Sequence, residues 1–451
     1  MKDILLSLCM FVLACLVSSA QAQKPPNVIV ILSDDQGSID MGAYGVQDLL
    51  TPNLDRLASS GLRFTQFYAG SAVCSPSRAS LLTGKVPHRA GVPGNAGSIQ
   101  GGPHGLPPEE ITMAEVFKNA GYATAHIGKW HLGYTPDKMP NAQGFDYSFG
   151  HMGGCIDNYS HFFYWNGPNR HDLHQNGQEV FRDGHYFPDL MVEEAQQFII
   201  NNQNNPFFIY FAINMPHYPY QGDEKWLQYY REKGTPYPRD LYNAFVSSLD
   251  ERIGRLIDFI DEQGLRENTI IVFQSDHGHS TEERAHFGGG NSGPYRGAKF
   301  SLFEGGIRVP ALISWPGRLP QGEVRNQMLC SIDWLPTLAE LTAINLDQSD
   351  LDGRSFASII RNEAAGTPHP DLHWQMNQRW AVRKGKWKLL YDPHDTSDGR
   401  SIPENTEENM LFLVDLSQDV SEQKNRSNEY PEVVKELEEL HHRWESRWTS
   451  N

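Results

Sequence analysis

The chain is short of cysteine, of basic residues and of long apolar runs. Its 451 residues carry 38 Lys and Arg against 55 Asp and Glu, a formal net charge of −17. With no basic stripe to displace counterions, we do not expect nucleic acid as a main partner. Beyond the N-terminus no apolar run is long enough to span a bilayer, so no stable membrane span is expected. Internal repeats and low-complexity segments are also missing, which argues against a solenoid.

Only five cysteines are present, and two of them, Cys9 and Cys15, lie in the first 22 residues. The remaining three, Cys74, Cys155 and Cys330, are an odd number. At least one thiol is therefore left over even if Cys155 and Cys330 form a disulfide, a point that the sequence leaves open.

The N-terminus has the pattern of a secretory signal. Lys2 precedes an apolar run over residues 4–17, and an A-x-A site follows at Ala20 to Ala22. We predict a signal peptide over residues 1–22, cleaved after Ala22, and hence a secreted or periplasmic protein. A lipid anchor on Cys15 is a weak alternative, because Leu13 is a poor residue two positions before it.

From residue 27 to about 342, short apolar runs alternate with amphipathic helical patterns. The pattern predicts an α/β fold whose mostly parallel central sheet is flanked by helices, within a catalytic domain over residues 23–365. Strands are expected over residues 27–32, 123–127, 207–213 and 269–273. Residues 366–451 predict a smaller α+β subdomain, with antiparallel strands over 372–376, 379–392 and 410–415 and a helix over 431–448.

Each of the four central strands is followed by side chains that can take part in chemistry. In order along the chain these are Asp34 and Asp35, then Lys129 and His131, then His217, and then Asp276 and His277. Because ligands of open parallel sheets bind beyond the carboxyl ends of the strands, we expect these residues to converge on one site.

The three carboxylates of Asp34, Asp35 and Asp276 suggest a metal site. Close carboxylates repel each other unless a cation lies between them, and oxygen-rich sites suit calcium or magnesium. Asp34 and Asp35 alone would fit a polar turn. The presence of Asp276 and His277 after another strand favours a metal site instead. His277 is the softer ligand of the set, because imidazole suits hard cations less well than carboxylate does.

The run CSPSRASLLTG, residues 74–84, is the most specific signal. A helix expected to begin near Ser77 would place Cys74 just before its positive end, with Arg78 one turn further on. The run resembles the type I sulfatase signature C-x-P-S-R-x-x-L-[LM]-T-G at every fixed position. The resemblance extends over residues 27 to about 387 and includes the motifs NVIVILSDDQG, GKWHLG, SDHG and AKFSLFEGGIRVPALISWPG.

The resemblance implies an alkaline-phosphatase-like fold and hydrolysis of sulfate esters. Cys74 would be oxidised to formylglycine (3-oxoalanine) by a separate maturing enzyme, and one hydroxyl of its hydrated aldehyde would attack sulfur. A single calcium ion, Ca2+, would be held by the modified residue 74 and by Asp34, Asp35, Asp276 and His277.

The resemblance also implies roles for the basic residues of the site. Positive charge on Arg78, Lys129 and Lys299 would stabilise the sulfuryl oxygens. His217 and Lys299 would protonate the departing alcohol, and His131 would accept the proton whose loss expels sulfate.

The segment over residues 151–186 mixes aromatic and hydrogen-bonding side chains, as sugar-binding segments do. We expect substrate-binding residues there, namely His161, Arg170, His171 and His174, although a packed surface loop explains the segment equally well. The favoured substrate is a sulfated carbohydrate, either a polysaccharide or a glycosaminoglycan fragment. Two alternatives remain, a phosphoester hydrolase on the same scaffold and an inactive glycan-binding protein.

Overall fold

The computed structural model describes residues 24–98, 102, 104–164, 169–397 and 410–449. The expected signal peptide and Cys15 lie outside the described residues. Among the residues that are described, no helix is long and apolar enough to cross a membrane.

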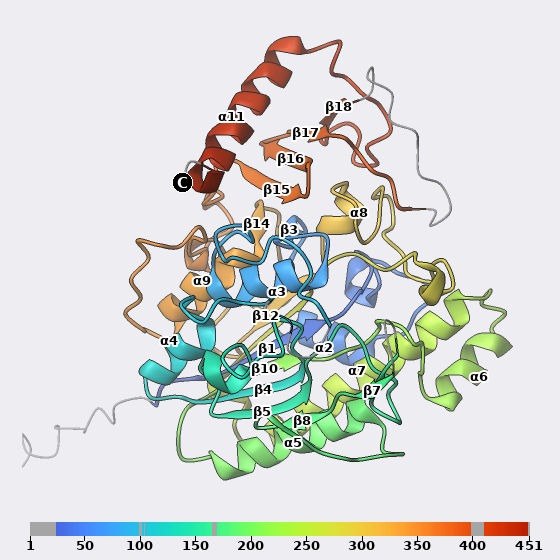
Figure 1. The fold of residues 1–451 in the computed structure, drawn as a ribbon, viewed down its shortest axis with the longest axis vertical. Helices are drawn as coiled ribbons and strands as arrows, with labels where there is room; N and C mark the ends of the chain where they lie inside the picture. Colours follow the sequence, from blue (N-terminus) through green and yellow to red (C-terminus); the bar gives the residue numbers. More distant parts are fainter. Residues whose placement is uncertain (1–23, 99–101, 103, 165–168, 398–409, 450–451) are drawn as a thin grey trace, which may run out of the picture.

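A ten-stranded mixed sheet forms the centre of the molecule (Figure 1). Its five middle strands are parallel and confirm the predicted core, in the order β11 (Thr269–Ser275), β1 (Asn27–Ser33), β10 (Phe207–Ala212), β4 (Ala123–Lys129) and β5 (Tyr147–His151). The edges are where the sheet becomes mixed: beyond β11 lie β12 (Ala311–Ser314), β2 (Leu62–Phe64) and β13 (Glu323–Arg325), and beyond β5 lie β8 (His174–Gln175) and β9 (Gln178–Glu179).

Helices cover both faces of the sheet because successive side chains of a strand point to opposite sides. Val28 and Val30 of β1 contribute to one apolar core, and Ile29 and Ile31 contribute to the other. The first core is closed by α3 (Cys74–Thr83), α4 (Met113–Asn119), α9 (Trp334–Leu341) and α10 (Ala357–Arg361), and the second by α2 (Pro52–Ser59), α5 (Phe187–Asn201) and α7 (Arg239–Glu262). The short helix α6 (Glu224–Glu232) packs against α7.

A separate antiparallel sheet near the C-terminus confirms the predicted α+β unit. It runs in the order β15 (Leu372–Met376), β16 (Arg379–Lys384), β17 (Trp387–Tyr391) and β18 (Leu411–Asp415), and α11 (Pro431–Thr449) packs on it. Figure 1 shows this unit above the central sheet. The two-stranded pairs β3 (Phe67–Tyr68) with β14 (Leu329–Cys330) and β6 (Phe162–Phe163) with β7 (Arg170–His171) lie outside the two large sheets.

One expectation about a helix start was wrong. Helix α3 begins at Cys74 rather than near Ser77. Pro76 is tolerated in its first turn, because the N–H groups there have no partner within the helix. Thr51 precedes α2 but its hydroxyl bonds no helix N–H; the Asp250 carboxylate of α7 accepts from the backbone N–H groups of Asn53 and Leu54 instead.

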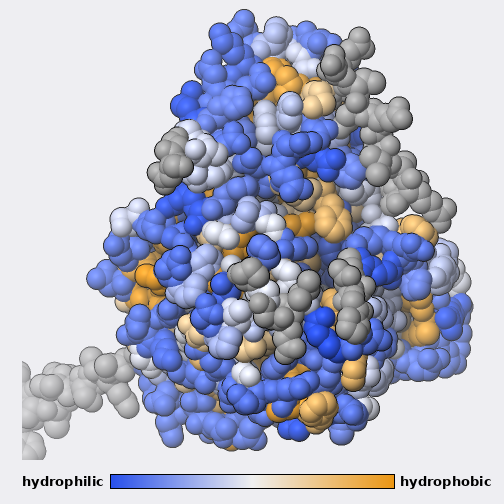
Figure 2. All heavy atoms as spheres, in the orientation of Figure 1, coloured by the Kyte–Doolittle hydropathy of each residue, from blue (hydrophilic) through white to orange (hydrophobic). Residues whose placement is uncertain are grey.

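The face seen in Figure 2 is mostly hydrophilic, and its apolar residues gather only in small separate groups. Such a surface is typical of a protein in water. The three cysteines in the described residues, Cys74, Cys155 and Cys330, are all buried free thiols, so the disulfide that the sequence left open is not formed.

Candidate active site

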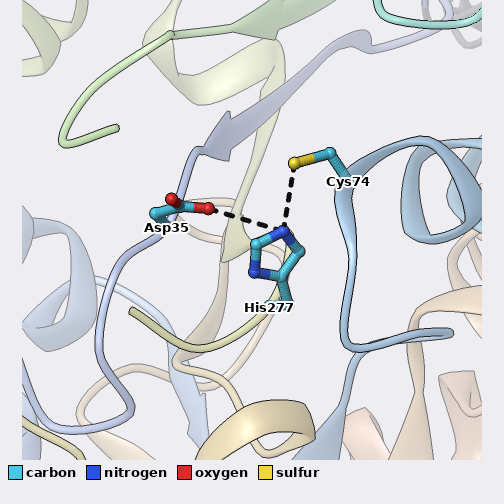
Figure 3. Close-up of side chains that lie close together, drawn as sticks. All are labelled: Asp35, Cys74 and His277. Carbon is cyan, nitrogen blue, oxygen red and sulfur yellow. Dashed lines mark hydrogen bonds and ion pairs between the residues drawn. The ribbon is translucent and has the colours of Figure 1, made fainter. Parts of the chain in front are cut away.

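Cys74 lies at the N-terminus of α3, beside the carboxyl ends of β1 and β11. Its side chain and that of Asp35 both point toward the ring of His277 (Figure 3). The Cys74 Sγ atom is 3.3 Å from His277 Nε2, and Asp35 Oδ1 is 3.5 Å from the same nitrogen. Cys74 is 2% exposed and Asp35 and His277 are equally buried, so bulk water screens these contacts little.

Two buried cations bind the carboxylates behind Cys74. The Lys129 Nζ atom at the end of β4 donates to both oxygens of Asp34, at 2.9 and 2.7 Å. The Arg78 guanidinium, one turn into α3, donates to Asp34 at 3.1 Å and to Asp276 at 2.9 Å. This network ties α3 to three strands of the sheet.

Lys299 and His217 lie on the other side of Asp35. The Lys299 Nζ atom donates to Asp35 Oδ2 at 2.9 Å and lies 3.7 Å from the carboxylate of Glu282. The ring of His217 donates from Nδ1 to the carbonyl of Tyr218 at 2.8 Å, which leaves Nε2 facing Asp35 Oδ2 at 3.7 Å. Asp35 therefore has cationic or imidazole groups at both oxygens but accepts no hydrogen bond at Oδ1.

A cavity of about 250 Å³ opens above these side chains. It is lined by Cys74, His131, His217 and Lys299 of the predicted catalytic set, together with Asn95, Ala96, Gly97, Ser98, Gly154, Phe163, Glu282 and Phe300. The structure thus places four of the six predicted catalytic residues on one cavity wall. Arg78 and Lys129 are fully buried behind them.

The electrostatics of the site fit a bound cation. Burial raises the pKa of Asp35 to about 7 and that of Asp276 to about 6, since the cations of the protein compensate these carboxylates only in part. Burial acts in the same direction on Asp34, but Lys129, His217 and Arg78 outweigh it and hold its pKa well below the usual value. Two overlapping groups have ligand atoms within 4.8 Å of one another, Asp35 with Cys74 and His277 and Asp34 with Cys74 and Asp276. The oxygen-rich donor set suits a hard cation such as calcium.

The four residues expected to bind substrate lie away from this cavity. His161, Arg170, His171 and His174 are in the segment between β5 and α5, and none of them lines the cavity wall. The Arg170 guanidinium carbon lies 4.1 Å from the centre of the Phe163 ring, and His174 Nδ1 lies 3.4 Å from Asp172 Oδ1. Their role in substrate binding stays a prediction.

Sequence reasoning missed Phe163, Glu282 and Asn95. Phe163 belongs to the two-residue strand β6, which is too short to show a periodic pattern. Glu282 lies in a loop, where Ser280 and Tyr218 donate to its carboxylate. The side-chain Oδ1 atom of Asn95 accepts from the backbone N–H of Ser75, next to Cys74. Phe163 lies in the segment over residues 151–186 where substrate-binding residues were expected, but no motif singles out any of the three.

Comparison with known proteins agrees with this geometry. The family model described as Sulfatase matches residues 26–344, about two thirds of the chain. The chain belongs to the sulfatase family. Sulfatases are sulfuric ester hydrolases, which is the activity class of this chain. A second model, described as N-sulphoglucosamine sulphohydrolase, C-terminal, matches residues 297–446.

Relatives of this sulfatase are similar over most of their length. Arylsulfatase A of Homo sapiens is 33% identical over 95% of this chain and 89% of its own. N-acetylgalactosamine-6-sulfatase of Canis lupus familiaris is 34% identical over 83% of this chain and 73% of its own. The crystal structure of Ps i-CgsB is 28% identical and superposes with a TM-score of 0.82, covering 93% of each chain.

Proposed function

We propose that this sulfatase is an exported enzyme that removes sulfate from a carbohydrate, using formylglycine made from Cys74 and one bound calcium ion. The observation that carries the proposal is the position of Cys74: it lines the active-site cavity at a helix N-terminus, within contact distance of His277. Burial alone would raise the pKa of its thiol, but Lys129, Lys299 and His277 lower it well below the usual value. An anion is therefore stabilised at this position.

Asp34, Asp35, Asp276 and His277 would hold the calcium ion, together with the modified residue 74. Calcium, when bound, would supply positive charge to a sulfuryl oxygen. The buried Oδ1 atom of Asp35, which accepts no hydrogen bond within the protein, supports this assignment. A buried carboxylate oxygen without a partner is costly, and a cation would supply the partner.

The remaining polar residues would position the ester and move protons. Formylglycine supplies a hydrated aldehyde, whose two hydroxyl groups serve as nucleophile and as the group that later expels sulfate. Lys129, Arg78 and Lys299 would stabilise negative charge on the sulfuryl group. His131 lines the cavity with Cys74 and its Nδ1 atom has no hydrogen-bond partner, so it can accept a proton there.

His217 and Lys299 are the candidate donors to the departing alcohol. Both line the cavity on the side of Asp35. Lys299 carries protons on Nζ, whereas His217, whose Nδ1 proton is bonded to the Tyr218 carbonyl, would donate from Nε2 only as the doubly protonated imidazolium and otherwise offers Nε2 as an acceptor. General acid catalysis of this kind contributes about 10²–10⁴-fold to a rate.

A carbohydrate substrate is supported by the relatives and by the cavity itself. Ps i-CgsB has been solved in complex with k-i-k-neocarrahexaose, and other relatives bear the name N-acetylgalactosamine-6-sulfatase. In this chain the cavity combines the aromatic ring of Phe163 with the polar side chains of Asn95, Ser98 and Glu282. That mixture suits a sugar ring with hydroxyl groups. Export is supported by the signal pattern of residues 1–22, and a maturing enzyme is the implied partner.

The first test is sulfate release from defined sulfated saccharides by protein produced together with a maturing enzyme. Carrageenan and glycosaminoglycan oligosaccharides, an aryl sulfate and an aryl phosphate make up the panel. We expect sulfate from one class of saccharide, and a peptide containing residue 74 that is lighter than its cysteine form. Cys74→Ala should lower turnover by at least about 10⁴-fold, whereas the matched variant Cys330→Ala, in a buried site away from the cavity, should keep it. Phosphate release without sulfate release would refute the proposal.

A second test concerns the metal. Chelation should abolish turnover, and added calcium should restore it. Asp35→Asn should raise the calcium concentration needed for half-maximal activity, while Asp48→Asn, at a surface carboxylate paired with Arg239, should not. Full activity after verified removal of divalent cations would exclude the calcium assignment.

A further inference from the structure

A second group of metal-type ligands lies in the segment between β5 and α5. Its first member, His161, is fully buried. The Nε2 atom of His161 lies 3.0 Å from the backbone carbonyl of His185, and a carbonyl can only accept, so Nε2 carries the proton. In the neutral ring Nδ1 then has a free lone pair, and this atom has no hydrogen-bond partner. Buried polar atoms without a partner are rare in proteins and call for an explanation.

In His171 the two ring nitrogens have the opposite roles: Nδ1 makes the hydrogen bond and Nε2 is free. Its Nδ1 atom lies 3.1 Å from the carboxylate of Glu179, which leaves Nε2 unprotonated in the neutral ring and without a hydrogen-bond partner. The ring is stacked on Phe181 with 4.3 Å between the ring centres, and its side chain is only 4% exposed. Nε2 faces the Asp183 carboxylate at 4.0 Å. Histidines that bind a metal through one ring nitrogen usually donate the N–H of the other nitrogen to a carboxylate, as His171 does to Glu179.

We propose that His161 Nδ1, His171 Nε2 and the Asp183 carboxylate bind a transition-metal ion, with Zn2+ the best match. The three ligand atoms lie within 4.8 Å of one another. Two imidazoles and one carboxylate are a zinc-type set, unlike the carboxylate-rich set beside Cys74. Three protein ligands leave the fourth tetrahedral position to water. Asp183, with 70% of its side chain exposed, gives the ion a path from solvent.

The proposed ion would position a wall of the active-site cavity. His161 directly precedes β6, and His171 pairs with Phe162 across the β6–β7 ladder. Phe163 of the same hairpin lines the cavity and is covered by Arg170. The metal would join this hairpin to the segment that carries Asp183. It touches neither the cavity nor Cys74, so it acts by positioning Phe163 and not as a catalytic group.

Binding can be tested with Co2+ as a visible probe in the Cys74→Ala protein, with calcium in excess. That background removes the only thiol of the calcium site, so it separates the two sites. We expect one equivalent of Co2+ with the intense visible absorption of tetrahedral coordination, displaced by one equivalent of Zn2+. His171→Gln and Asp183→Asn should weaken Co2+ binding by at least about 100-fold.

His185→Gln is the matched control, because the exposed ring of His185 bonds only to the carbonyl of Arg182 and its backbone carbonyl is unchanged. It should bind Co2+ as the parent does. Asp183→Asn changes an exposed side chain, so a folding failure will not obscure the result. In the mature enzyme, loss of zinc should raise KM several-fold with little change in kcat. The proposal is overturned if Co2+ does not bind, or if binding survives both His171→Gln and Asp183→Asn.

Discussion

Two buried clusters of charged residues include the two ends of the segment from Lys299 to Glu304. They differ in whether they border a cavity. In the catalytic cluster, Asp34, Asp35 and Asp276 are buried beside Cys74 and Lys299, which line a cavity, and Asp35 Oδ1 accepts no hydrogen bond. The interface cluster consists of Glu304, Lys388 and Glu422. Lys388 Nζ lies 2.9 Å from an oxygen of each glutamate.

In the interface cluster, three of the four carboxylate oxygens accept a hydrogen bond, and the fourth, Glu422 Oε1, is in ion-pair contact with Lys388 Nζ at 2.9 Å. The second oxygen of Glu304 accepts from the Tyr68 hydroxyl at 2.6 Å, and that of Glu422 accepts from the backbone N–H of Glu304 at 2.6 Å. Lys388 comes from β17, so the cluster joins the C-terminal sheet to α8 (Glu304–Ile307). A cluster closed on itself stabilises the fold, whereas one that opens on a cavity is completed by a ligand. The two should therefore respond oppositely to substitution.

The largest expected effect separates activity from stability in the catalytic cluster. His217→Gln removes from the cavity an imidazole that can take up and donate a proton, so turnover should fall by about 10²–10⁴-fold. Because one neutral side chain replaces another, the free energy of unfolding should change by less than about 1 kcal/mol. Sulfate release and urea unfolding measure the two quantities, with His442→Gln on the exposed side of α11 as control. Equal loss of both quantities would contradict the distinction.

The next effect is on stability in the interface cluster. Lys388→Met leaves two buried carboxylates with too little positive charge, which should lower the free energy of unfolding by about 3–5 kcal/mol. Lys384 lies on the neighbouring strand β16 and forms an exposed ion pair with Glu436. Lys384→Met should therefore lower the free energy of unfolding by less than about 1 kcal/mol. Urea unfolding of both variants gives the comparison. If the two lysines prove equivalent, the interface cluster is not a stabilising element.

The sequence predicts the parallel core and the residues at its strand ends well, because both follow from local pattern. Apolar runs such as that of β1 are recognisable without any contact information, and Asp34 and Asp276 follow directly from where such runs end. The fold and the convergence of the catalytic cluster were predictable for this reason. The roles within that cluster came from the resemblance to sulfatases.

What the sequence could not show depends on tertiary contacts. Lys388 and Glu422 resemble surface residues in the sequence, and only packing between β17 and α8 buries them. Strand β12 pairs antiparallel with both β11 and β2, although nothing in its short apolar run distinguishes it from a parallel strand. In the same way, the pairing of β6 with β7 brings His171 near His161, ten residues away in the sequence.

The smallest expected effect concerns pH. One lysine shared by two buried carboxylates cannot fully compensate both, so one carboxyl tends to keep its proton. Burial acts against ionisation of Glu304, yet Lys388 and Arg308 outweigh it and lower its pKa to about 2. Burial and the charge of Glu304 raise the pKa of Glu422 to about 7 despite Lys388. Glu422 is therefore the group that titrates near neutral pH.

A raised pKa in the folded state means that Glu422 contributes stability when protonated. This contribution is complete below about pH 4.5, its ordinary pKa, and is lost as the pH rises through about 7. Glu422→Gln keeps the neutral form at every pH, so the fall in unfolding free energy between pH 5 and pH 8 should flatten by roughly 1–3 kcal/mol. Glu436→Gln, at the exposed pair with Lys384, should leave the slope unchanged. An unchanged slope in Glu422→Gln would mean that Glu422 is already ionised at pH 5 and that Lys388 compensates both carboxylates.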